Sequence, residues 1–143
     1  MSLWEEFNFE ERIREILQNV TYYRDTHQFG RPFLTAYQIA IEYAHRYPND
    51  FIRIGLQIGG RGIGERNSLA QYIAGQLSRR MSEELPDFEG GFISNNHLVE
   101  ISFEHDGHRI ISSLTNTMYD LSMFRLRQEP TSTVGMLNQN LKS

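Results

Sequence analysis

The sequence predicts an α+β fold in a single domain spanning residues 1–143, with helices first and a C-terminal β-meander. Three patterns predict this fold. Apolar residues recur at helical spacing in three segments, apolar and polar residues alternate in others, and an Asp-Gly pair joins two of the alternating segments. We therefore expect about three helices packed on one face of a roughly four-stranded, mainly antiparallel sheet.

The first two helices are expected over residues 9–25 and from Thr35 to just before Pro48. In the first, apolar side chains share one face and charged side chains the other. Thr35 and Gln38 have the spacing of a capping box, in which two side chains satisfy free amide groups at a helix start. Pro48 follows the second apolar stripe and predicts its end.

A strand and a third helix are expected next. Residues 51–58 alternate between apolar and polar side chains, which predicts a half-buried strand. A glycine-rich loop follows this segment. Ser68 and Gln71 then form a second capping box, so the third helix is expected from Ser68 to a point before Pro86.

The last third of the chain predicts β-structure. An Asp-Gly pair flanked by alternating segments is the strongest short hairpin signal, so residues 98–105 and 108–114 should pair around Asp106 and Gly107. A further strand is expected over residues 119–126. Residues 128–143 are polar and form a C-terminal tail of the domain.

Composition narrows the environment in which the protein works. The chain has no cysteine, which excludes disulfides, thiol catalysis and cysteine-ligated metals, fits a reducing compartment and predicts a cytoplasmic protein. The N-terminal segment lacks the apolar region of a signal peptide, and no apolar run reaches the roughly 20 residues of a membrane span, so no membrane contact is expected.

Charge is unevenly distributed along the chain. The net charge is −4, which disfavours a protein whose whole surface binds nucleic acid. Residues 51–82 nevertheless carry five arginines against one acidic residue. Arginine's planar guanidinium suits carboxylate and phosphate groups. These arginines either contact an anionic partner or pair with acidic residues of the same fold.

The glycine-rich loop at residues 59–68 is the main candidate site. It joins the expected strand to the third helix, which is the setting of phosphate-binding loops. The Gly-Lys-Ser/Thr of a P-loop is missing, and Glu65 takes the place of the third glycine of a dinucleotide fingerprint. A structural connection and a protein-partner surface are the alternatives. The residues expected to contact a ligand are Gly60, Arg61, Gly62, Gly64, Arg66, Asn67 and Ser68.

A second candidate lies at the predicted hairpin. Its register places His105 opposite His108, beside Asp106, and two imidazoles with a carboxylate can ligate a metal ion. Both histidines flank an exposed turn, so the sequence predicts solvated turn residues and no metal site here, with His105 and His108 kept only as candidates. No Gly-x-Ser-x-Gly or His-Glu-x-x-His motif is present, and no cofactor is expected.

These patterns predict a non-catalytic binding or interaction module. It would contact an anionic small molecule or an acidic protein surface through residues 59–68, and self-associate into a homo-oligomer through its tyrosine-rich helices. One alternative is a winged-helix-like DNA-binding regulator, against which the acidic hairpin and the roughly 20 residues between the second and third helices count. The other is an enzyme whose site the sequence does not reveal.

Overall fold

The computed structural model describes residues 1–22, 27–61, 68–113 and 120–127. Helices and strands within these ranges confirm the predicted α+β class. The elements in chain order are α1 (Leu3–Glu6), α2 (Phe9–Gln18), β1 (Leu34–Thr35), α3 (Ala36–Arg46), α4 (Pro48–Ile54), α5 (Leu69–Arg80), β2 (Phe88–Ile93), β3 (Ser102–His105), β4 (His108–Ile111) and β5 (Leu121–Leu126). The expected tail at residues 128–143 lies outside the described residues. Among those that are described, no helix combines the length and the apolar character needed to cross a membrane.

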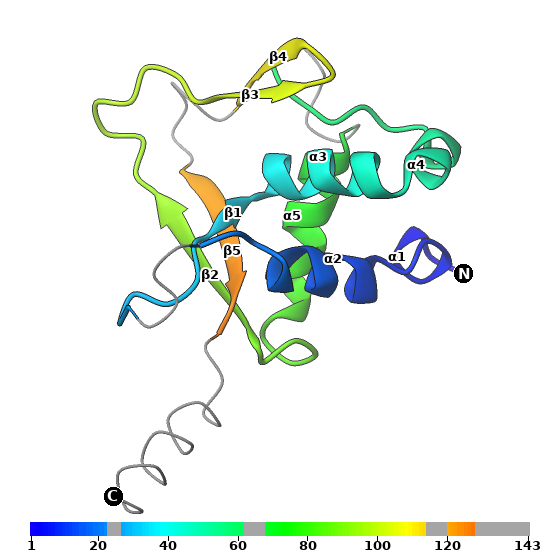
Figure 1. Ribbon diagram of the computed structural model, residues 1–143, viewed down its shortest axis with the longest axis horizontal. Coiled ribbons are helices and arrows are strands. Elements are labelled where there is room, and N and C mark those ends of the chain that lie inside the picture. The colour runs from blue at the N-terminus through cyan, green and yellow to red at the C-terminus, as the bar shows by residue number, and fades with distance from the viewer. Residues whose placement is uncertain (23–26, 62–67, 114–119, 128–143) are drawn as a thin grey trace, which may run out of the picture.

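The strands form two separate sheets. In the first, β5 lies between β1 and β2 and pairs antiparallel with both. In the second, β3 and β4 form the predicted hairpin, with His105 opposite His108. The helices lie to one side of the three-stranded sheet, and the hairpin lies over α3 (Figure 1). The last strand, β5, was expected to continue a meander with the hairpin. It pairs instead with β1 and β2, two strands that were not predicted.

Two predicted capping residues set the helix starts. The Thr35 hydroxyl accepts the Gln38 amide at 3.2 Å, and the Gln38 side chain accepts the Thr35 amide at 2.7 Å, which completes the capping box of α3. The Ser68 hydroxyl accepts the Gln71 amide at 3.1 Å at the start of α5. These local hydrogen bonds explain why both starts could be predicted.

The predicted strand at residues 51–58 is wrong, because residues 48–54 form α4. Pro48 occupies the first helical position, where its fixed φ suits a helix and its missing N–H is not needed. Phe51 and Ile54 pack against the core three residues apart, whereas Ile52 is 74% exposed. Gly55 ends the helix with a φ of +75°. The segment is therefore a helix in which Phe51 and Ile54 share the buried face, and the alternation of apolar and polar residues was a misleading strand signal.

The first helix is also shorter than expected. α2 ends at Gln18, where the sequence predicted a helix to residue 25. Val20 and Thr21 follow this end, and their branched Cβ atoms disfavour helix continuation. Because the helix is shorter, residues 19–22 and 27–33 belong to the connection between α2 and β1. This connection borders a cavity.

Aromatic side chains fill the core between α1, α2, α3 and α5. The Phe9 ring is fully buried and stacks on the rings of Tyr43 and Trp4, with centroids 4.8 and 5.7 Å apart. Tyr37 and Tyr43 are 3% and 0% exposed. Because these two tyrosines belong to the core, they provide no surface for the self-association predicted from them.

An ionic cluster ties α2, α3 and α4 together. The Arg12 guanidinium donates to the Asp50 carboxylate at 2.8 Å and to the Tyr43 hydroxyl at 2.9 Å, and lies 3.9 Å from the centre of the Tyr47 ring. Burial raises the pKa of Tyr43. The hydrogen bond from Arg12 is the largest effect on Asp50 and lowers its pKa below the ordinary value of 3.8. Asp50 therefore stabilises the fold as a carboxylate.

We expect Asp50→Asn to lower the free energy of unfolding at pH 7. The pKa of Asp50 is lower in the folded than in the unfolded chain, so its contribution is fully present above about pH 4. That contribution is lost as the pH falls through the folded-state pKa. Urea unfolding of both proteins between pH 7 and pH 2.5 measures the difference, which should shrink below about pH 3.8. A difference that stays constant over this range would contradict the role given to the charge.

Candidate functional site

The structure describes three of the seven residues predicted to contact a ligand, namely Gly60, Arg61 and Ser68. The other four, Gly62, Gly64, Arg66 and Asn67, lie outside the described residues. Ser68 is 3% exposed, and its hydroxyl caps α5. The side chain of Ser68 therefore has a structural role whether or not the loop binds a ligand.

The amide groups that begin α5 are already used by the chain. Leu69 donates to the Gln57 carbonyl at 2.7 Å, and Ala70 donates to the Ile58 carbonyl at 2.9 Å. Together with the Gln71 bond to Ser68, these contacts occupy the first three N–H groups of the helix. An anion at this helix start would have to displace them, so the N-terminus of α5 is not free to bind one.

The first half of the glycine-rich loop packs on the hairpin. The Arg61 amide donates to the Ile111 carbonyl at 3.1 Å. A Cβ at Gly60 would lie 3.2 Å from this same carbonyl oxygen and 3.2 Å from Cγ2 of Ile110. Gly60 has a φ of +123°, which side chains rarely allow. Glycine is therefore required here for close approach of two backbones.

A cavity of about 440 Å³ lies between this loop, the end of α4 and the hairpin. Its lining includes the guanidinium-bearing residues Arg61 and Arg109, together with His105. Arg109 is 65% exposed at its side chain and is paired with Glu100. A guanidinium has five N–H donors and can bond two acceptors at once, so pairing with Glu100 does not use all the donors of Arg109.

Three potential metal ligands gather beside this cavity. The carboxylate of Asp106, at the hairpin turn, has one oxygen 3.6 Å from Nε2 of His45 and the other 3.5 Å from Nε2 of His105. The two imidazole rings stack with their centroids 5.3 Å apart. Nε2 of His105 is the nitrogen that faces the Asp106 carboxylate, and Nδ1 is buried without a hydrogen-bond partner among the described residues.

The histidine group in the structure differs in one member from the candidate pair named from the sequence. His105 and Asp106 do come together, but the second imidazole belongs to His45 of α3 and not to His108. The hairpin folds over α3, with the Phe103 ring stacked on Tyr37 at 5.1 Å, and this brings its turn to the last turn of the helix. No local pattern in the sequence signals such a contact across 60 residues.

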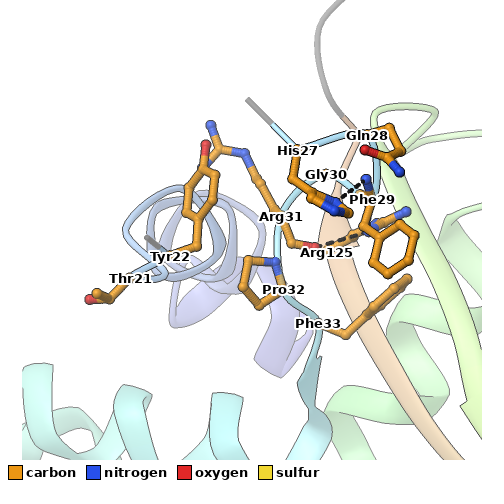
Figure 2. A pocket seen from close by; sticks show the side chains of 10 residues that line it. All are labelled: Thr21, Tyr22, His27, Gln28, Phe29, Gly30, Arg31, Pro32, Phe33 and Arg125. Carbon is orange, nitrogen blue, oxygen red and sulfur yellow. Dashed lines mark hydrogen bonds between the residues drawn. The ribbon is translucent and has the colours of Figure 1, made fainter. Parts of the chain in front are cut away.

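A larger cavity of about 890 Å³ lies on the connection between α2 and β1 and was not predicted (Figure 2). Figure 2 shows Phe29 and Phe33 close together near Arg125, with Tyr22 beside Arg31 on the opposite side. The ring of Phe29 is 73% exposed. The remaining lining residues are Thr21, His27, Gln28, Gly30 and Pro32.

Hydrogen bonds fix the walls of this cavity. The guanidinium of Arg125 lies 4.2 Å from the Phe33 ring centre, donates to the carbonyls of Phe29 and Arg31, and pairs with Glu89 at 2.7 Å. Arg31 reaches the Gln18 carbonyl at the end of α2 at 3.0 Å and lies 5.4 Å from the centre of the Tyr22 ring. The aromatic walls are therefore positioned by contacts with both the sheet and α2.

Most described arginines pair with acidic residues. For the basic segment at residues 51–82, pairing within the fold was the alternative to an anionic partner. Within residues 51–82, Arg53 pairs with Asp50 at 3.1 Å and Arg80 pairs with Glu84 at 2.8 Å. Ion pairs of this exposed kind contribute little stability. These two ion pairs neutralise part of the positive charge of residues 51–82, which was one reason for predicting an anion site.

Comparison with known proteins adds no function. No protein-family model, no curated protein and no solved structure matches the chain. Two cavities and the group of His45, His105 and Asp106 are candidate sites among the described residues.

Proposed function

We propose that this protein is a non-catalytic binding module whose ligand occupies the cavity shown in Figure 2. The observation that carries the proposal is the combination of three aromatic rings and two guanidinium groups around about 890 Å³. Ligand pockets are commonly of this size, with mostly apolar walls and a few polar groups that orient the ligand.

The wall chemistry favours a flat apolar ligand that carries a negative charge. Aromatic faces such as those of Phe29, Phe33 and Tyr22 stack with planar groups. Arg31 makes one described hydrogen bond, to Gln18, so further N–H donors of its guanidinium can bind a carboxylate, sulfonate or phosphate. The exposed Phe29 ring gives a ligand apolar surface to cover.

We expect Phe29→Ala to weaken binding of the aromatic anion 1-anilinonaphthalene-8-sulfonate about tenfold, a loss of about 1.4 kcal/mol from the lost stacking surface. Fluorescence titration of the full chain measures the dissociation constant. The folding stability should change by less than about 0.5 kcal/mol, because the substituted ring is mostly exposed.

Phe92→Ala is the matched control for this titration. Phe92 is 71% exposed, close to the 73% of Phe29, but it lies on β2 and does not line the cavity. Arg31→Gln should also weaken binding, and its effect should shrink at high salt. An equal loss in the Phe29 and Phe92 variants would show that the dye binds exposed rings generally, and would remove the cavity from the proposal.

A second candidate site is the 440 Å³ cavity between residues 57–61 and the hairpin. It keeps the sequence-based prediction of an anionic ligand or an acidic partner surface, since Arg61 and Arg109 both line it. The residues of the loop outside the described ranges, Arg66 among them, belong to the same prediction. This site suits a compact anion better than a flat aromatic one, because it has fewer aromatic walls.

The remaining predictions have less support from the geometry. A winged-helix protein would present its hairpin tip to DNA, but here Asp106 at the tip faces His45 of α3. The described groups with shifted pKa values include Tyr43 and Asp50, which belong to the ionic cluster around Arg12 and line neither cavity. Self-association and a cytoplasmic location stay as predictions from the sequence, and an enzyme stays as an alternative to the binding module.

A further inference from the structure

We propose that His45, His105 and Asp106 form a binding site for a divalent transition-metal ion such as Zn²⁺. Each residue offers one ligand atom, and these three atoms all lie within 4.8 Å of one another. The site shares no residue with the cavity of Figure 2, so the inference does not depend on the proposed function.

The distances suit a shared metal ion better than direct hydrogen bonds. Zn²⁺ binds imidazole nitrogen and carboxylate oxygen at about 2.0–2.1 Å, so neighbouring ligand atoms of a tetrahedral site are roughly 3.3 Å apart. One Asp106 oxygen lies 3.6 Å from Nε2 of His45, and the other lies 3.5 Å from Nε2 of His105. A charge-assisted hydrogen bond would bring nitrogen and oxygen to about 2.8 Å. Because the three ligand atoms lie within 4.8 Å of one another, metal binding needs them to approach one another by at most about 1.5 Å.

The surrounding fold holds His105 and the hairpin turn in place before any ion binds. His105 lies between the stacked ring of His45 and the edge of the Phe51 ring, with centroids 5.3 and 6.2 Å away. The hairpin turn is fixed by the Gly107 amide, which donates to the Glu104 carboxylate at 2.6 Å. The ion therefore has to order mainly the exposed side chains of His45 and Asp106, and not His105 or the turn.

The open side of the site allows an ion to enter. The side chain of His105 is only 17% exposed, whereas those of His45 and Asp106 are 48% and 71% exposed. Water can supply the fourth ligand from this side, as in zinc sites with three protein ligands. Two imidazoles with one carboxylate favour zinc, copper or nickel over magnesium and calcium, which prefer oxygen ligands alone.

Isothermal titration of the full chain with ZnCl₂ at pH 7.5, after removal of bound metal with a chelator, tests the site. We expect one equivalent to bind with a dissociation constant on the order of 1 µM. His45→Ala and Asp106→Asn should each weaken binding at least tenfold. Asparagine also tolerates the positive φ of +50° at position 106, so the second variant preserves the turn.

His108→Ala is the matched control, because His108 lies directly opposite His105 in the hairpin but outside the ligand group. Its zinc affinity should stay within twofold of the unsubstituted protein, and circular dichroism checks that all variants are folded. Absence of saturable binding, binding that survives in Asp106→Asn, or an equal loss in His108→Ala would each overturn the proposal.

Discussion

Phe9→Ala is expected to lower the free energy of unfolding by about 3–5 kcal/mol. The Phe9 ring is completely buried and contacts three other rings, with its centroid 4.8 Å from Tyr43, 5.5 Å from Tyr72 and 5.7 Å from Trp4. Alanine would leave a cavity among large, rigid side chains that cannot collapse into it. Since small domains have about 5–15 kcal/mol of stability in total, this loss approaches the limit of folding.

Chemical denaturation of the full chain measures this change, with Ile52→Ala as the control. Ile52 is 74% exposed on α4, so the same kind of truncation should alter stability by less than about 0.5 kcal/mol. A loss below about 1 kcal/mol for Phe9→Ala would mean that the aromatic cluster is not the centre of the core.

Gly60→Ala is expected to lower the free energy of unfolding by about 2–3 kcal/mol. Alanine would be strained at a φ of +123°, and its Cβ would press on the Ile111 carbonyl oxygen at 3.2 Å. This oxygen accepts the Arg61 amide and belongs to β4, so it cannot move away without disturbing the hairpin. Faster hydrogen exchange of the β4 amides should accompany the loss.

Gly55→Ala separates backbone strain from crowding. Gly55 also has a positive φ, +75°, but no described atom lies within 4 Å of the position a Cβ would take. It should lose only about 1 kcal/mol, the cost of a left-handed alanine. Equal losses at both positions would contradict the close packing of residues 59–61 on the hairpin.

Local signals in the sequence predicted the parts of the fold that local interactions determine. The capping residues Thr35 and Ser68 and the Asp106-Gly107 turn each act within four residues, and all three lie where they were expected. The α4 segment was wrongly predicted as a strand because its few apolar residues fit both the helical period of about 3.6 and the strand period of about 2. Packing against the core determined which of the two structures formed.

β2 shows why tertiary contacts decide the rest of the fold. Gly90 and Gly91 have low strand propensity, so no strand was predicted there. In the structure a Cβ at Gly90 would lie 3.1 Å from Cε of Met81, beyond the end of α5. The glycines therefore mark close approach of a neighbouring side chain, which one sequence does not reveal.

The candidate sites depend on the same long-range contacts. His45 had no visible partner in the sequence, since the hairpin reaches it only by packing Phe103 on Tyr37. The cavity of Figure 2 forms where Arg125 of β5 meets the connection at residues 27–33, about 95 residues earlier. The glycine-rich loop could be recognised from the sequence, but its hydrogen bonds to α5 and β4 could not be predicted.

Backbone amide spectra recorded during a titration with 1-anilinonaphthalene-8-sulfonate test the central claim most directly. If the cavity of Figure 2 is the ligand site, saturable shifts should centre on residues 27–31, Phe33 and Arg125. Shifts confined to residues 57–61 and β4 would place the anion in the smaller cavity, and the absence of any saturable shift would contradict binding at either one.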